Sequence, residues 1–147
     1  MELNKVINYL KKQPLMYLAT IDGNCPKVRP VALIYHKENF WFVSIAGRDK
    51  IKQIKNNNNI EFAVNPNDDD SISTIRGQGL AILIEDSDVK RDVTTAIPWF
   101  KEYWDSANDP KFVLYKIELE KVSVQIPKIR DIYTFDLISG ETTIKKE

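Results

Sequence analysis

Four residues between Arg29 and Lys50 have the types and the spacing of an anion-binding site. Arg29 lies in an apolar run, Ser44 ends a second apolar run, and Arg48 and Lys50 follow the small pair 46–47. A guanidinium on an apolar face is costly unless a fixed partner meets it, and its fork suits carboxylate or phosphate oxygens. A hydroxyl, free backbone N–H groups at the first turn of a helix and two more cations would complete a phosphate-binding cradle. The alternative is that Arg29 pairs with a structural aspartate or glutamate.

The segments around these residues predict how they are positioned. We expect a strand at 26–35, a turn at 37–39, a strand at 40–45 and a short helix that begins near Arg48. Side chains alternate between the two faces of a strand, so the residues of 26–35 divide into two sets. Arg29 shares one face with Val31, Leu33 and Tyr35, and the other face carries Val28, Pro30, Ala32 and Ile34.

The rest of the chain predicts a mainly β (α+β) fold, an antiparallel barrel of six strands with peripheral helices. The expected elements are a helix at 2–12, a strand at 15–21 with a hairpin turn at 22–24, strands at 60–64 and 71–84, two short helices within 86–104, a strand at 112–126 and one tail strand at 132–137. The first three strands have apolar residues on both faces, which predicts a sheet covered by the barrel interior on one face and by a helix or second subunit on the other.

Composition limits the class of protein. The 147 residues predict one domain, and 21 basic and 21 acidic residues leave no net charge to attract nucleic acid or an anionic membrane. The single cysteine, Cys25, excludes an internal disulfide, and we find neither a signal peptide nor an apolar run that would span a bilayer. We therefore expect a soluble cytoplasmic protein that binds neither nucleic acid nor membrane.

Other candidate residues have plainer interpretations. We interpret His36 as a solvent-facing turn residue, Cys25 as an incidental small residue, and the acidic cluster 68–70 as a solvated turn. No metal site is expected. The aromatic residues of 99–104 predict core or dimer packing, with a lid over a flavin or substrate as the alternative. The lysines of 50–55 could form only a solvated helix face.

The order of elements and four segments resemble the pyridoxamine 5′-phosphate oxidase-like family. The segments are LATIDGNCPKVRPVAL, FWFVSIAGRDKIKQI, IRGQGLAIL and YKIELEKV, and the resemblance covers most of the chain. It implies a single FMN-binding split-barrel domain over 1–147, with 127–147 as a C-terminal strand and tail. It further implies a homodimer with two flavin sites at the interface, each contacted by both chains.

The resemblance also assigns roles within the second strand. Arg29 matches the family's arginine that contacts the flavin phosphate and ribityl region. Pro30 and Val31 match neighbours whose backbone lies along the isoalloxazine ring.

Further roles fall between the third strand and the following helix. Ser44, with Ile45 beside it, matches a small hydroxylated position, and Lys50 matches a lysine that pairs with phosphate. Arg48, two residues before Lys50, is a further phosphate candidate.

Two departures from the family pattern separate this chain from the vitamin-making oxidase. The basic and aromatic C-terminal segment of that enzyme has no counterpart here, and Ile72 stands where a flavin-contacting glutamine is expected. We therefore expect an FMN-dependent oxidoreductase that passes hydride or electrons between reduced flavin and a small acceptor. The alternatives are a non-catalytic flavin-binding or stress-response module and a barrel that binds single-stranded nucleic acid, which the neutral charge disfavours.

Overall fold

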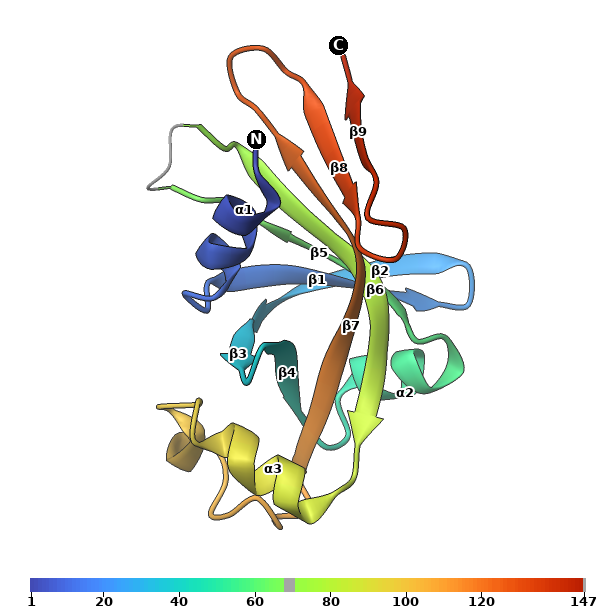
Figure 1. Cartoon of the computed structure of the whole chain (residues 1–147). Coiled ribbons are helices and arrows are strands. Elements are labelled where there is room, and N and C mark those ends of the chain that lie inside the picture. Colours follow the sequence, from blue (N-terminus) through green and yellow to red (C-terminus); the bar gives the residue numbers. More distant parts are fainter. Residues whose placement is uncertain (68–70, 147) are drawn as a thin grey trace.

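The computed structural model describes residues 1–67 and 71–146, and in this part of the chain nine strands join in one antiparallel sheet system (Figure 1). The strand order is β2-β1-β5-β6-β7-β4-β3, with a β8–β9 hairpin attached to β7. The strands are β1 Leu15–Asp22, β2 Cys25–Ala32, β3 Ile34–His36, β4 Asn39–Ile45, β5 Asn59–Val64, β6 Thr74–Ile84, β7 Phe112–Gln125, β8 Ile132–Asp136 and β9 Thr142–Lys145. The helices are α1 Leu3–Leu10, α2 Asp49–Asn56, α3 Ser87–Thr94 and the 3₁₀ helix η1 Phe100–Glu102.

The predicted fold class is confirmed: a mainly antiparallel β structure with peripheral helices. The predicted number of strands is too low. The expected strand 26–35 is two strands, because the chain turns a corner at Leu33, whose N–H donates to the Pro14 carbonyl at 3.2 Å. After this corner β3 pairs with β4 instead of β1. The tail also adds β9, which pairs with β8.

Strand β7 pairs with three other strands of the sheet. One of its edges pairs with β6 along nearly its whole length. Its other edge is shared, because residues 112–117 pair with β4 and residues 121–125 pair with β8. The sheet therefore forks along β7, with β4 and β8 leaving it in different directions (Figure 1).

Two glycines on β6 allow its close approach to neighbouring strands, as their positions on one face predicted. A Cβ atom at Gly77 would lie 2.3 Å from the Phe62 ring, and one at Gly79 would lie 2.1 Å from the Glu118 carbonyl oxygen on β7. The pairing of β6 with β7 also shifts register between Gln78 and Gly79. The two glycines therefore allow neighbouring groups to approach β6 closely, and they lie where its pairing with β7 is irregular.

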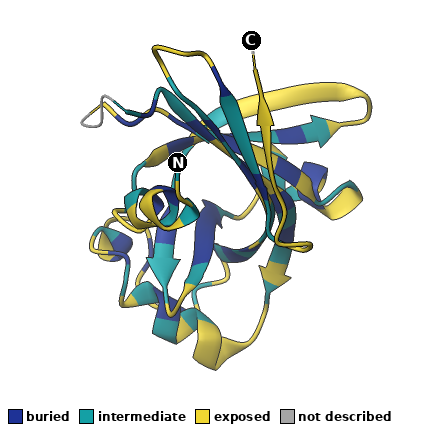
Figure 2. Cartoon of the chain, turned by 45° about the horizontal axis from the view of Figure 1, so that its top comes forward, coloured by how far each residue is buried: buried dark blue, intermediate teal, exposed yellow. Residues whose placement is uncertain are grey.

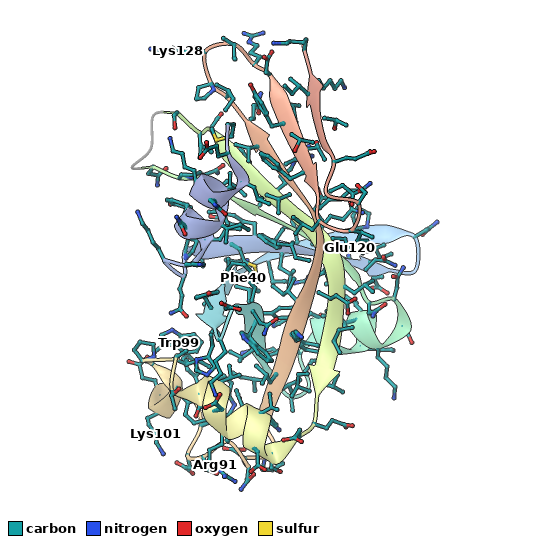
Figure 3. All side chains as sticks on the ribbon, in the orientation of Figure 1. Phe40, Arg91, Trp99, Lys101, Glu120 and Lys128 are labelled. Carbon is teal, nitrogen blue, oxygen red and sulfur yellow. The ribbon has the colours of Figure 1, made fainter. Side chains whose placement is uncertain are left out.

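Two hydrophobic clusters cover different faces of β4. Phe40 and Phe42 belong to the main core inside the barrel, which Figure 3 shows around Phe40. Trp41 and Val43 belong to a second cluster formed with the segment that follows β6. The segment that carries α3 and η1 therefore packs on the outer face of β4.

The outer face of the β1–β2 hairpin has no such cover from the residues that the structure describes. Leu15, Tyr17 and Val28 are 55%, 47% and 68% exposed. Figure 2 shows much of the hairpin in the exposed colour, and the same holds for β9 along its length. The chain itself thus leaves one apolar face of this hairpin open.

His36 at the end of β3 is not a solvent-facing turn residue, so that interpretation is wrong. Its side chain is 18% exposed, and its Nε2 atom lies 2.8 Å from Asp92 Oδ2 on α3. Lys37 binds the same carboxylate oxygen at 2.7 Å. Hydrogen bonds from Lys37 and then His36 lower the pKa of Asp92 below its ordinary value. This cluster ties the β3–β4 turn to α3.

Candidate functional site

A cleft of about 930 Å³ opens where the barrel is not closed by strand pairing. β2 lies at one end of the strand order and β3 at the other, and β2 and β4 do not pair with each other in the described part of the chain. The cleft is bounded by β2, the end of β4, α2 and the segment at η1. Its volume is typical of small-molecule and cofactor sites. The structure brings all seven predicted site residues to its wall: Arg29, Pro30, Val31, Ser44, Ile45, Arg48 and Lys50.

Arg29 projects from β2 into a set of oxygen acceptors that carry no charge. Its Nη1 atom donates to Thr20 Oγ1 at 2.7 Å and to the Leu18 carbonyl at 3.3 Å. Its Nη2 atom donates to Gln53 Oε1 at 2.8 Å. Thr20 Oγ1 and Gln53 Oε1 are themselves 2.6 Å apart. The guanidinium is therefore fixed by neutral groups on β1 and α2.

No carboxylate forms an ion pair with Arg29 in the described part of the chain, which excludes there the alternative of a structural partner. Burial lowers the pKa of Arg29, and the more distant charge of Asp49 opposes this effect. Two of the five guanidinium N–H groups have no described protein acceptor, since three are used by Thr20, Leu18 and Gln53. These two groups are free to meet a ligand.

Two further cations stand beside Arg29 at the beginning of α2. Arg48 is the N-cap residue of this helix, and Lys50 lies in its first turn. Burial first, and then the charges of Arg29 and Arg48, lower the pKa of Lys50. Burial and two neighbouring positive charges thus disfavour the charged form of Lys50.

The backbone at the start of α2 supplies part of the predicted cradle. The Ala46 N–H donates to the Lys111 carbonyl at 2.9 Å, so this group is not available. The N–H groups of Gly47, Asp49 and Lys50 have no partner among the described residues. Free N–H groups at the N-terminal end of a helix favour a negative charge.

Ser44 differs from the prediction in one respect. Its side chain is 4% exposed, and its hydroxyl donates to the Ile45 carbonyl at 3.3 Å. The hydroxyl therefore donates to a ligand only if this contact is exchanged. Pro30 on the opposite wall is exposed, and Val31 is half-buried against the barrel core.

An aromatic wall faces the cleft from the segment at η1. Trp99, Tyr103 and Trp104 line the cleft, and Figure 3 shows Trp99 towards β3 and β4 whereas Lys101 extends outward. Phe100 and Trp104 also belong to the second hydrophobic cluster. The prediction of core packing is therefore confirmed for Phe100 and Trp104, whereas a lid over a flavin or substrate stays a prediction.

Trp104 has an unusual polar group at this wall. Its side chain is 4% exposed, and its indole Nε1–H has no hydrogen-bond partner in the described part of the chain. By contrast, the Nε1–H of Trp41 donates to the His36 carbonyl at 3.1 Å. A buried unpaired donor is costly, and such groups cluster at functional sites.

Thr20 and Gln53 were not predicted as site residues, although helical spacing points to Gln53 and the pairing of the hairpin points to Thr20. Gln53 follows Lys50 by three residues, so both lie on one face of α2. The hairpin register pairs Arg29 with Leu18, which places Thr20 on the same face one diagonal step away. The other residues that line the cleft and were not predicted are Ile21, Asp22, Gly23, Lys27, Val28, Ala32, Val43, Asp49, Lys52 and Asn56. The three aromatic residues of the cleft were predicted as packing residues, with a lid as the alternative.

The remaining candidates lie away from the cleft. Cys25 is exposed at the hairpin, and Ile72, which replaces the expected glutamine, is buried in the main core. The acidic cluster 68–70 lies outside the described residues. Within them, no group of three His, Cys, Asp or Glu side chains is placed to hold a metal ion. No described helix is long and apolar enough to cross a membrane.

Solved structures similar to this chain share its fold at low sequence identity. A NimC/NimA family protein from Clostridium acetobutylicum is 21% identical, covers 99% of this chain and 92% of its own, and has a TM-score of 0.69. General stress protein 26 from Bacillus anthracis is 20% identical, with coverages of 97% and 98% and a TM-score of 0.64. PhzG from Burkholderia lata, in complex with tetrahydrophenazine-1-carboxylic acid, is 10% identical, with coverages of 98% and 86% and a TM-score of 0.67.

The sequence comparisons place the chain in a family. No curated protein matches it in sequence. The family model for pyridoxamine 5′-phosphate oxidase matches residues 4–126, which run from the second residue of α1 to just past the end of β7. Members of this family commonly bind flavin. The chain belongs to the pyridoxamine 5′-phosphate oxidase family.

Proposed function

We propose that the protein binds FMN in the cleft and passes hydride or electrons between the reduced flavin and a small acceptor. One observation carries the proposal: Arg29, Arg48 and Lys50 converge on the cleft, and none of the three forms an ion pair with a carboxylate in the described part of the chain, although Asp49 also lines the cleft. Free N–H groups at the start of α2 add to the attraction for a phosphate. The donors present therefore fit the phosphate of FMN.

The cleft offers different chemistry at its two ends, which gives the flavin an orientation. Arg29, Arg48 and Lys50 would hold the phosphate at the basic end. Pro30 and Val31 would place their backbone along the ring system, towards Trp99 and the other aromatic residues of the opposite wall. Ser44 and Ile45 at the end of β4 would border the chain that joins phosphate and ring.

Bound flavin supplies the hydride and electron transfer, so the protein needs no separate nucleophile. The chain's residues bind the phosphate, orient the ring and exclude water from it. Trp99 and Tyr103 present aromatic surface to the cleft, and Tyr103 is 58% exposed. Such surface suits stacking with a planar acceptor. The tetrahydrophenazine-1-carboxylic acid bound by PhzG supports a ring compound as the acceptor.

We further propose that the working form is a homodimer with the flavin sites at the interface. The open face of the β1–β2 hairpin carries Leu15, Tyr17 and Val28, and Val28 also lines the cleft. A partner on this face would bury apolar surface and cover the cleft at the same time. We place this dimer in the cytoplasm, where the exposed thiol of Cys25 stays reduced.

A second candidate is a flavin-binding module without turnover, active in stress response. The similarity to general stress protein 26 favours it. The two candidates share the same FMN site and differ only in whether the flavin is reduced and reoxidised.

Reconstitution with FMN tests the proposal and separates the candidates. The purified protein, incubated with FMN and desalted, is expected to stay yellow, and the colour is expected to bleach anaerobically with NADH or NADPH. Reoxidation by a nitroaromatic compound would support the oxidoreductase. A yellow protein that no nicotinamide donor reduces would support the non-catalytic module, and a colourless protein would contradict both.

A further inference from the structure

We infer that Gln53 is a bifunctional residue of the phosphate site: its amide oxygen positions Arg29, and its amide nitrogen donates a hydrogen bond to the phosphate. This inference rests on the proposed binding of FMN. It adds a ligand that is uncharged and that lies on the buried face of α2, where the sequence indicated only lysines.

The chemistry of Arg29 fixes the orientation of the Gln53 amide. A guanidinium can only donate, so the Gln53 atom at 2.8 Å from Arg29 Nη2 must be the oxygen. Thr20 Oγ1 likewise accepts from Arg29 Nη1 at 2.7 Å and so gives its own hydrogen to Gln53 Oε1 at 2.6 Å. Both donors therefore meet on the oxygen, and the amide nitrogen cannot take its place.

The nitrogen of Gln53 is left for a ligand. The side chain is 7% exposed and lines the cleft. Its Nε2 atom has no hydrogen-bond partner in the described part of the chain, and it is not among the unpartnered side-chain atoms there that are sealed from solvent, a condition that Trp104 Nε1 meets. Nε2 therefore keeps some contact with solvent, and because Gln53 lines the cleft beside Arg29, we take this contact to be with the cleft.

The neutrality of Gln53 matters as much as its donors. An acidic side chain at this position would hold Arg29 equally well, because Arg29 and Thr20 both donate to it. A carboxylate, however, would neutralise Arg29, remove the two N–H donors and repel a phosphate. We therefore infer that an amide at position 53 makes the cleft selective for FMN over riboflavin, which has the same ring and ribityl chain but no phosphate.

The substitution Gln53→Glu tests this inference because its two expected effects have opposite directions. The thermal midpoint of the apoprotein should stay at or above the wild-type value, since the introduced carboxylate can pair with Arg29. The affinity for FMN should fall by about 100-fold, and the affinity for riboflavin should change less than about threefold. Gln78→Glu adds the same charge at an exposed site on β6 and should leave both affinities unchanged.

Gln53→Met provides a second variant that removes the amide without adding charge. Here FMN affinity should fall about tenfold, again with little effect on riboflavin. Wild-type affinity for FMN in both variants, or an equal loss for FMN and riboflavin, would overturn the role of Gln53. If the wild-type protein bound no FMN, the proposed function itself would fail, so the two failures are distinguished by the wild-type titration.

Discussion

The positive charge of Arg29 remains available to a ligand because its described partners are neutral. Thr20, Leu18 and Gln53 supply oxygen atoms at hydrogen-bond distance, and none of these atoms carries a formal charge. An aspartate or glutamate in their place would fix the side chain but cancel its charge. At the scale of single residues, the site is thus built to hold a cation rigidly without neutralising it.

Arg29→Ala is expected to weaken FMN binding by about 2 kcal/mol or more, which is roughly 30-fold in the dissociation constant. The loss arises from charge-assisted contacts to the phosphate, and quenching of flavin fluorescence measures it. Arg76→Ala, at an exposed arginine on β6, is the matched control. An unchanged FMN affinity in Arg29→Ala would refute the assignment of this residue.

Lys50→Met is expected to affect stability and binding in opposite directions. Its folded-state pKa is lowered, so the unfolded chain binds this proton more tightly, and wild-type apoprotein gains stability as the pH rises through the folded-state pKa. The substitution removes this penalty, so the apoprotein at pH 7 should be more stable, by at most about 1 kcal/mol because solvent screens a half-exposed charge.

The gain in stability from Lys50→Met should disappear once the pH exceeds the ordinary pKa of lysine, because Lys50 is then neutral in both the folded and the unfolded state. FMN affinity of the variant should fall at pH 7. Thermal melts from pH 7 to 11 and flavin titration measure these effects. Lys55→Met, at an exposed lysine in the last turn of α2 that does not line the cleft, is the control, and a destabilised Lys50→Met apoprotein would contradict the predicted repulsion.

The cations of the site could be predicted from the sequence, but their buried partners could not. Arg29 and Lys50 could be predicted because a charged side chain beside apolar strands is costly unless it has a partner or a ligand. Thr20 and Gln53 are ordinary at their own positions, and their role appears only when the hairpin register and the docking of α2 bring them to Arg29. The position of the Ser44 hydroxyl depended likewise on a local backbone contact.

At the scale of elements, β6 and β7 approach each other closely at Gly79. Gly79→Ala would place a Cβ atom 2.1 Å from the Glu118 carbonyl oxygen, and backbone on both strands would have to move. We expect a loss of about 2 kcal/mol or more in the free energy of unfolding, measured by chemical denaturation. Gln78→Ala on the same strand should cost less than about 1 kcal/mol, and equal effects of the two substitutions would contradict this account.

Long regular elements could be predicted, whereas corners and edges could not. The alternation along β6 and β7 and the helical spacing in α1 are strong local signals. The break at Leu33 is invisible locally, because apolar residues continue on both sides and only the bond to Pro14 separates β2 from β3. β9 is exposed throughout, so it shows no buried face in its sequence. His36 was misjudged because its partner, Asp92, lies 56 residues away.

At the scale of the whole molecule, the uncovered face of the β1–β2 hairpin and the cleft are continuous through Val28. Val28→Asp is expected to shift a dimer towards monomer, because the charge would have to be buried in the interface. Light scattering coupled to size-exclusion chromatography measures the mass. Ile138→Asp, at a 75% exposed residue in the β8–β9 turn, should leave the mass unchanged. A wild-type monomer at micromolar concentration would contradict the proposed dimer.

The most direct test of the central claim is a ³¹P NMR titration of FMN bound to the protein. Free phosphate monoesters take up a proton near pH 6, which moves their resonance. If Arg29, Arg48 and Lys50 surround the phosphate, they hold it as a dianion, and the bound resonance should stay at its pH 8 position down to about pH 5. A bound-state resonance that titrates near pH 6 like free FMN would contradict the placement of the phosphate among these three cations.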